Sequence, residues 1–242
     1  MVRGAFPLFR LAGIQVYLHF TWFLVAWFEI NSAKARYHSM LWPALEYCGL
    51  FALVLMHEFG HAFACRSTGG RADQIVLWPL GGLAFVDPPP RPTAVLWSIV
   101  AGPLVNVVLF PCFFFALIAA KHGWLPMSGD ARQALFYLWL TNTVLLVFNL
   151  LPFYPLDGGQ IVRALLWFKV GPIRSLYISG CIGMVGAVCI GCLAFYLRSI
   201  WTGIIAFFLF GQAGNAVQRA KEMRLAADIA QGTPPPPPAL KA

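Results

Sequence analysis

Charged side chains are scarce in this sequence. Asp, Glu, Lys and Arg make up 11% of the 242 residues, against about 25% in ordinary soluble domains. Hydrophobic residues make up 60%, and the mean hydropathy is +0.72. So few charges cannot cover the surface of a water-soluble domain, and a chain this apolar is not disordered. The composition therefore excludes an ordinary soluble protein and predicts one embedded in a lipid bilayer.

The sequence also lacks three patterns that would indicate other classes of protein. Its six cysteines lie almost entirely within apolar runs and do not form the disulfide framework of a secreted domain. Its Lys and Arg residues are scattered singly, so the net charge of +8 does not indicate nucleic-acid binding. No small-residue cleavage site follows the first apolar run. We therefore expect that run to be retained as a membrane span and not removed as a signal peptide.

Six segments are apolar enough to cross a bilayer, which takes about 20 residues of helix. We therefore expect an all-α polytopic membrane protein with about six transmembrane helices. The spans are residues 11–28, 41–65, 93–120, 133–156, 175–197 and 199–218. Between the second and third, residues 74–86 form two short apolar runs around Pro79, which predicts a small β-hairpin at the membrane surface. Prolines and glycines at the end of the fourth span predict that this helix is interrupted.

The distribution of positive charge predicts how the spans are oriented. Twelve of the 17 Lys and Arg residues fall on one side of a six-span arrangement and five on the other. Because positively charged loops stay in the cytoplasm, we expect a multi-pass protein of the cell (inner) membrane with both termini cytoplasmic. We expect one integral-membrane domain over residues 1–218, with its catalytic core at about 41–168. A polar, proline-rich cytoplasmic tail is expected over 219–242.

Ionisable side chains lie inside the second span, where each costs several kcal/mol without a partner. Residues 57–61 read His-Glu-Phe-Gly-His, and in a helix His57 and His61 lie one turn apart on the same face. Two imidazoles at this spacing can bind one zinc ion, and Glu58 can act on water beside it. The motif can also arise by chance or on a solvated helix face, but the apolar span argues against a solvated face. We therefore expect one Zn²⁺ per chain.

A catalytic zinc ion generally has three protein ligands, so His57 and His61 need a third. Asp157 is the other acid within a long apolar segment, and it ends a run that contains two prolines. This run predicts a break in the helix, and a broken helix at membrane depth would line a polar cavity. The charge distribution places Asp157 toward the cytoplasm, on the same side as the two histidines. The alternative is that Asp157 is the N-cap of a helix over residues 158–168; capping and ligation are compatible.

Three motifs together resemble the site-2 protease, or M50, family of intramembrane zinc metalloproteases. They are H-E-F-G-H at 57–61, A-G-P-L-V-N at 101–106 and N-x-x-P-x-x-P-L-D-G at 149–158, in the order of that family. The resemblance covers about residues 41–168. It implies a core of three helices in which His57, His61 and Asp157 bind zinc and Glu58 is the catalytic glutamate.

The resemblance also implies a substrate class and a mechanism. Members of the family cleave membrane-anchored proteins in or near a transmembrane helix, so we expect a single-span or otherwise anchored protein as substrate, in contact with the lipid bilayer. Glu58 takes a proton from water as the water attacks the peptide carbonyl. Asn149 and Pro152 help to present the substrate or bind its oxyanion. Asn106 shapes the site or makes an interhelical hydrogen bond, and residues 74–86 pair with an unwound substrate strand.

Three further expectations concern an alternative function, the role of His19 and the absence of accessory domains. A zinc-binding membrane transporter or sensor without peptidase activity would also use histidines, but its ligands should follow a path across the membrane. His19, near the end of the first span, is expected to line the mouth of the cavity and not to bind zinc. The sequence contains neither an inserted PDZ domain nor a CBS domain, so we expect a compact form of the family.

Overall fold

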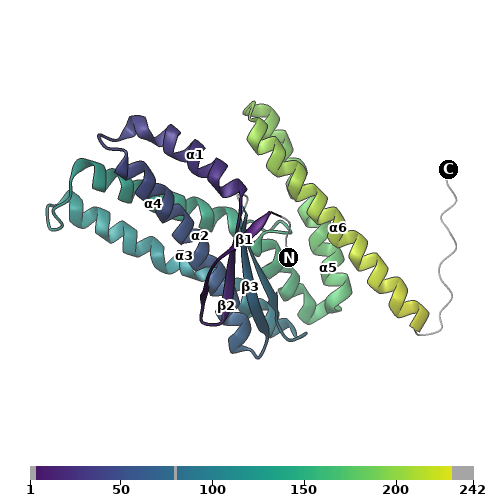
Figure 1. The fold of residues 1–242 in the computed structure, drawn as a ribbon. Helices are drawn as coiled ribbons and strands as arrows, with labels where there is room; N and C mark the ends of the chain where they lie inside the picture. Colours follow the sequence, from purple (N-terminus) through teal and green to yellow (C-terminus); the bar gives the residue numbers. More distant parts are fainter. Residues whose placement is uncertain (1–3, 79–80, 231–242) are drawn as a thin grey trace. The chain divides into compact units, whose positions relative to one another are not determined.

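The computed structural model describes residues 4–78 and 81–230. Within these residues the chain is mostly helical (Figure 1). In chain order the elements are β1 (Ala5–Leu11), β2 (Ile14–His19), α1 (Thr21–Ala33), η1 (Lys34–Arg36), α2 (Leu41–Ser67), β3 (Arg71–Trp78), β4 (Gly81–Asp87), α3 (Pro92–Lys121), α4 (Gly129–Asn149), α5 (Asp157–Tyr196) and α6 (Ile200–Ala230). The chain divides into two compact units, Met1–Asn149 and Leu150–Ala242.

Four helices within the described residues are long and apolar enough to cross a membrane, namely α2, α3, α5 and α6. These four helices confirm the expectation of a multi-pass membrane protein. They do not confirm the expected number of six crossings, which would require two more helices. The agreement is closest for α3, which covers the span expected over residues 93–120 with one additional residue at each end.

The span expected over residues 11–28 is wrong in its first half. Ile14–His19 forms strand β2, and α1 begins only at Thr21 and has 13 residues. The strand forms because Ile14, Val16 and Leu18 alternate with less buried residues, which is the period-two pattern of a sheet with one buried face. A count of apolar residues over a long window does not register that period. The protein is therefore not all-α.

The four strands form one sheet in the order β1-β2-β3-β4. The β1–β2 and β3–β4 pairs are antiparallel, and the β2–β3 pair is parallel. The hairpin expected over residues 74–86 is thus present as β3 and β4, but it belongs to a larger sheet. Parallel pairing of β2 with β3 requires a crossover connection, which α1 and α2 provide.

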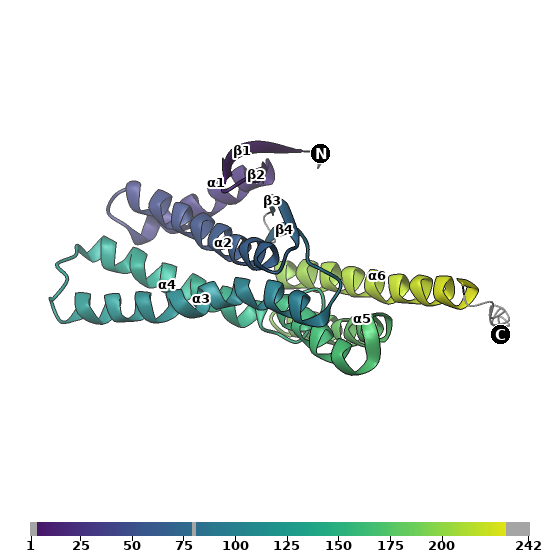
Figure 2. The same ribbon diagram turned by 90° about the horizontal axis from the view of Figure 1, so that it is seen from below.

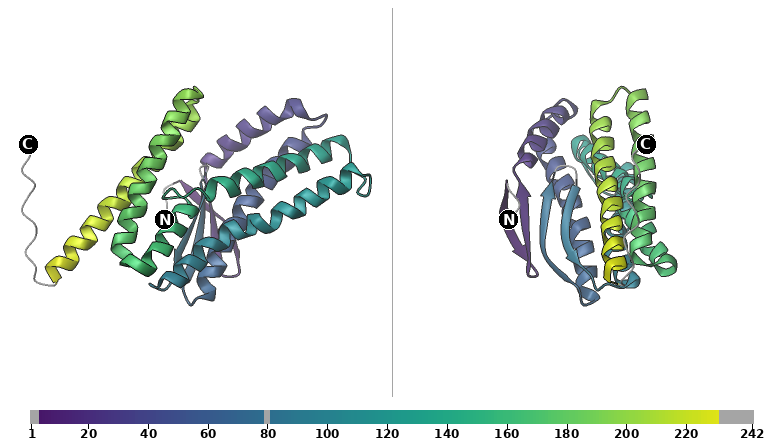
Figure 3. Two further views of the ribbon diagram at one scale, coloured as in Figure 1. Left: turned by 180° about the vertical axis from the view of Figure 1, so that it is seen from behind. Right: turned by 90° about the vertical axis from the view of Figure 1, so that its right-hand side faces the viewer.

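The buried side of the sheet packs against α2 and fixes the helix that carries the H-E-F-G-H motif (Figure 3, right). One hydrophobic cluster joins residues of β2 and β3 to Phe59 and Ala62 of α2. At about 100° per residue, His57 and His61 lie on the side of α2 roughly opposite to Phe59. The histidines therefore face away from the sheet. On their side of α2 lies α3, which runs side by side with α4 in the opposite direction (Figure 2).

The second unit consists of residues 150–156 and helices α5 and α6. The helix α5 bends at Gly171, whose φ of 79° and ψ of 171° are not helical. Beyond the bend it packs closely along α6, where a Cβ on Gly180 would lie 2.7 Å from Cγ2 of Val217. The helix α6 continues past residue 218 as far as Ala230. The proline-rich part of the expected tail, after residue 233, lies outside the described residues.

Candidate metal centre

His57 and His61 lie one turn apart on α2 and bring their Nε2 atoms close together. The two Nε2 atoms are 3.1 Å apart, and the residues are only 5% and 8% exposed. With zinc–nitrogen bonds of about 2.0–2.1 Å and tetrahedral angles, two nitrogens on one ion lie about 3.4 Å apart. The observed spacing therefore suits a single ion held by both imidazoles.

Each histidine is oriented by an acceptor on α3. Nδ1 of His57 lies 2.7 Å from Oδ1 of Asn106, and Nδ1 of His61 lies 2.8 Å from the main-chain oxygen of Ser98. Because both partners accept hydrogen bonds, each neutral ring carries its proton on Nδ1 and its lone pair on Nε2. This tautomer is the one that binds zinc through Nε2.

The helices α2 and α3 approach closely because glycines lie at their contacts. A Cβ on Gly60 would lie 2.6 Å from the main-chain oxygen of Ala101, and a Cβ on Gly102 would overlap the imidazole ring of His61. Gly60 belongs to the H-E-F-G-H motif and Gly102 to the A-G-P-L-V-N motif. Both motifs therefore contribute close packing as well as polar groups.

Replacing Gly102 by alanine should weaken zinc binding. The added methyl group would overlap the His61 ring, which cannot move aside without losing its hydrogen bond to the main-chain oxygen of Ser98. We expect zinc affinity to fall by about 10–100-fold, the range typical for loss of the outer partner of a ligand histidine. Competition against a chromophoric chelator measures the affinity. The control is Gly211→Ala on α6, where a Cβ would meet nothing within 4 Å. Equal affinities for the two variants would show that Gly102 does not position His61.

Glu58 follows His57 directly and is 6% exposed. At about 100° per residue its side chain leaves α2 roughly a quarter-turn from that of His57. A buried carboxyl group is rare in a membrane helix because the ionised form is costly at membrane depth. Here it accompanies two buried imidazoles, a combination that suits the hydrolytic chemistry of zinc enzymes.

The interruption predicted at the end of the fourth span is present. The helix α4 ends at Asn149, and α5 begins at Asp157. Glycines at positions 158 and 159 allow the intervening segment to fold against the start of α5, because Cβ atoms there would overlap its main-chain atoms. Leu156 occupies the N-cap position of α5, so capping does not account for Asp157.

The expected site residues fall in both units of the chain. The first unit holds His57, Glu58, His61, Asn106 and Asn149, and the second holds Pro152 and Asp157. Within the first unit, the structure brings the two histidines and Asn106 together. At the ends of the interruption, Asn149 and Asp157 are half-buried, whereas Pro152 is exposed.

Three positions around the histidines had been given no role from the sequence, namely Ser98, Gly102 and Asn142. Ser98 contacts His61 through its main-chain oxygen and also through its hydroxyl, which donates to the main-chain oxygen of His61 over 3.3 Å. Asn142, which is fully buried, did leave a signal. It is an isolated amide in an apolar span, where such groups usually hydrogen-bond to a neighbouring helix.

His19 lies at the end of β2 and belongs to a different environment. Its ring stacks on Trp78, with the ring centroids 4.2 Å apart, and its Nδ1 lies 2.6 Å from Oγ1 of Thr21. These contacts account for a buried histidine at the end of the sheet without a metal ion.

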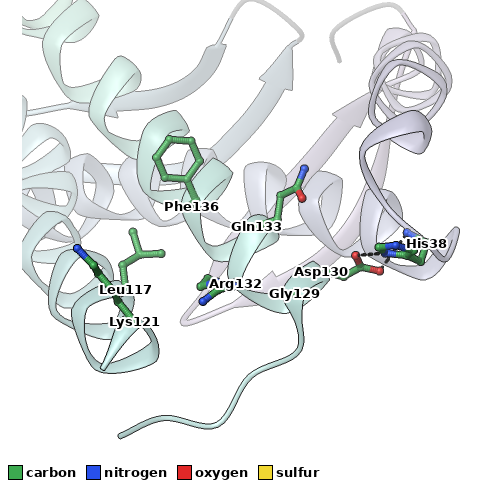
Figure 4. A pocket seen from close by; sticks show the side chains of 8 residues that line it. All are labelled: His38, Leu117, Lys121, Gly129, Asp130, Arg132, Gln133 and Phe136. Carbon is green, nitrogen blue, oxygen red and sulfur yellow. Dashed lines mark hydrogen bonds and ion pairs between the residues drawn. The ribbon is translucent and has the colours of Figure 1, made fainter. Parts of the chain in front are cut away.

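A pocket lies where α3 ends and α4 begins (Figure 4). Its lining consists of His38, Leu117, Lys121, Gly129, Asp130, Arg132, Gln133 and Phe136. Nδ1 of His38 lies 2.8 Å from Oδ1 of Asp130, and this hydrogen bond raises the pKa of His38 and lowers the pKa of Asp130. None of the lining residues belongs to the three motifs, so this pocket is separate from the candidate metal centre.

Comparison with known proteins supports the interpretation of the motifs. The chain matches the family Peptidase M50B-like over residues 31–154, just over half of its length, and Peptidase family M50 over residues 118–193. A zinc metalloprotease of Methanocaldococcus jannaschii is 31% identical over 214 residues, which are 87% of this chain and 61% of the relative. Stage IV sporulation protein FB of Bacillus subtilis is 32% identical over 131 residues, 53% of this chain and 42% of that protein.

A solved structure extends the similarity to the fold. The site-2 protease from Methanocaldococcus jannaschii has a TM-score of 0.66 and 28% sequence identity, and the match covers 88% of this chain and 95% of that chain. The chain spans about three-fifths of the length of the first curated relatives that it matches. The family match and the structural match agree with the three motifs, and the chain therefore belongs to the M50 peptidase family.

Proposed function

We propose that this chain is an intramembrane zinc metalloprotease that hydrolyses a peptide bond in or near the transmembrane segment of a membrane-anchored protein. The observation that carries the proposal is the buried pair of imidazoles whose Nε2 atoms lie 3.1 Å apart, with Glu58 buried beside them. Membership of a peptidase family supports the choice of hydrolysis over transport or sensing.

The residues present fit a zinc ion. His57, His61 and Asp157 each offer one atom that can bind a metal ion. Two imidazoles and a carboxylate are a ligand set of catalytic zinc sites, which keep one position for water. When bound, zinc supplies a Lewis acid that lowers the pKa of water to about 7. We assign the third ligand position to Asp157, because it is the acid of the third motif.

Glu58 provides the acid–base chemistry in this proposal. As an ionised carboxylate it accepts a proton from water while the water oxygen attacks the carbonyl carbon of the peptide. The same carboxyl group then returns the proton to the nitrogen of the leaving amine, so that the C–N bond breaks and Glu58 is regenerated. The side-chain amide of Asn149 donates a hydrogen bond to the oxyanion, and Pro152 helps to present the substrate.

The membrane arrangement in the proposal has six crossings, with both termini and the site toward the cytoplasm. The helices α1 and α4 would be the two crossings beyond the four apolar helices. The 21 residues of α4 reach about 30 Å, enough for the hydrocarbon core, but the 13 residues of α1 reach only about 20 Å. We therefore propose that the bilayer is thinned around α1.

Substrate pairing is assigned to β4. The strand β3 is bonded on both sides, to β2 and to β4, whereas β4 is an edge strand among the described strands. An extended substrate segment can add only to an edge, where backbone N–H and C=O groups are available. The expectation that residues 74–86 pair with the substrate is thereby assigned to the strand β4, Gly81–Asp87.

A proline in β4 tests this assignment. Adjacent residues of a strand point their N–H groups to opposite sides, so a proline at 84 or at 85 removes one outward donor. We expect one of these two variants to lose most of its cleavage of a single-span substrate while binding zinc normally. The matched control is Leu8→Pro in β1, at the opposite edge, where Leu8 is 41% exposed. Full cleavage by both β4 variants would exclude strand pairing at this edge.

The proposed function itself is tested with the purified full chain and a single-span substrate in lipid vesicles. We expect cleavage that stops when a chelator removes zinc and returns when zinc is added. Zinc-dependent movement of ions across the vesicle membrane without any cut product would instead favour a transporter.

A further inference from the structure

Two fully buried asparagines form a reciprocal contact behind His57. Nδ2 of Asn106 on α3 donates to Oδ1 of Asn142 on α4 over 2.8 Å. Nδ2 of Asn142 donates in return to the main-chain oxygen of Asn106 over 3.0 Å. Oδ1 of Asn106 faces Nδ1 of His57 at 2.7 Å. Both asparagines are 0% exposed, so water does not substitute for any of these partners.

The direction of each of these three hydrogen bonds follows from one group that can only accept, the main-chain oxygen of Asn106. A main-chain oxygen only accepts, so the group of Asn142 that faces it must be the NH₂ group. Oδ1 of Asn142 then faces Asn106 and requires the NH₂ group of Asn106 opposite it. This leaves Oδ1 of Asn106 toward His57. The ring of His57 must therefore donate from Nδ1, and the neutral form of the ring then has its lone pair on Nε2.

The opposite orientation shows what Asn142 prevents. If the amide of Asn106 turned over, its NH₂ group would donate to Nδ1 of His57, and the ring proton would move to Nε2, the atom that should bind the metal. That turn would also place Oδ1 of Asn106 against Oδ1 of Asn142. Turning Asn142 as well would place two oxygens together at the main-chain carbonyl. Each alternative leaves a buried polar clash, which costs more than an ordinary hydrogen bond gains.

We infer that Asn142 is a positioning residue of the metal centre, which sets the tautomer of His57 through Asn106 and thereby raises the affinity for zinc. This inference rests on the proposed zinc site and extends it to a residue on α4 that belongs to none of the three motifs. Asn142 acts through Asn106 and is not assigned any contact with substrate.

The first measurement is zinc affinity. In Asn142→Ala the amide of Asn106 can turn over, and we expect zinc to bind about 10–100-fold more weakly, as is typical when the support of a ligand histidine is lost. The matched control is Thr143→Ala, the next residue of α4, whose hydroxyl bonds to the main-chain oxygen of Trp139 within the same helix. The control should bind zinc like the wild type.

A second background separates positioning from packing between α3 and α4. In Asn106→Asp, both carboxylate oxygens accept, so His57 donates from Nδ1 whichever way the side chain turns. We therefore expect that Asn142→Ala does not weaken zinc binding in this background, where it also removes Oδ1 of Asn142 from beside a carboxylate oxygen. An equal loss in both backgrounds would mean that Asn142 only holds the helices together, and would overturn the inference.

The third measurement does not need zinc at all. In zinc-free full-length protein labelled with ¹⁵N-histidine, the two ring nitrogens of His57 report which one carries the proton. We expect protonated Nδ1 in the wild type and a mixture of tautomers in Asn142→Ala. An unchanged tautomer in the variant would overturn the inference even if the wild type binds zinc. A wild type that shows the expected tautomer but binds no zinc would instead overturn the proposed function.

Discussion

We expect that replacing Glu58 by glutamine leaves a protein that binds zinc but does not cleave its substrate. Glutamine has nearly the same size as glutamate, so the 6% exposed position stays filled. Its amide group cannot accept a proton from water, and the general base is lost. Because general acid–base catalysis contributes roughly 10²–10⁴-fold, we expect kcat to fall by at least about 100-fold. The rate of product formation from a single-span substrate, measured together with zinc content, gives the result.

The control for this variant is the same chemical change elsewhere in the chain. Glu222 is exposed on α6 and accepts a hydrogen bond from Gln218, so Glu222→Gln should cleave like the wild type. Near-normal cleavage by Glu58→Gln would remove Glu58 from the mechanism. Loss of zinc from Glu58→Gln would instead indicate that Glu58 is a ligand.

Replacing Asp157 by alanine should reduce zinc binding more than any change behind the histidines. Without the carboxylate only His57 and His61 remain, and two protein ligands are fewer than catalytic zinc sites use. We expect the affinity to fall beyond the roughly 10–100-fold that loss of an outer partner causes, and cleavage to disappear with the metal. Titration with a competing chelator measures the affinity.

Two further variants make this result specific. Asp157→Glu keeps a carboxylate and should retain part of the affinity. Asp73→Ala removes an aspartate whose side chain is 76% exposed and lies 3.5 Å from Arg66, and it should bind zinc normally. Wild-type affinity in Asp157→Ala would place the third ligand elsewhere in the chain.

The sequence was most informative where spacing alone determines geometry. The i, i+4 separation of His57 and His61 fixes both on one face of a helix, so the convergence of their Nε2 atoms could be predicted. The interruption before Asp157 could also be predicted, because two prolines and two glycines close together disfavour a continuous helix. Of the groups that orient the histidines, Asn106 was named from its motif, but the others could not be predicted. The main-chain oxygen of Ser98 has no signature in the sequence, and Asn142 lies far from His57 along the chain.

The sheet was underestimated for a related reason. The residues of β2 are apolar enough to be counted into a membrane span, and their partner strand β3 follows only after the whole of α2. Pairing between segments so far apart depends on tertiary contacts and not on local preference. The alternation of Ile14, Val16 and Leu18 with Gln15, Tyr17 and His19 was the one local signal of a strand.

The most direct test of the zinc site is X-ray absorption at the zinc edge on the purified full chain. We predict one zinc ion per chain with nitrogen and oxygen ligands at about 2.0–2.1 Å, including two imidazoles. A zinc content far below one per chain would contradict this site. So would sulfur ligands at about 2.3 Å, which would place the metal on cysteines and not on His57, His61 and Asp157.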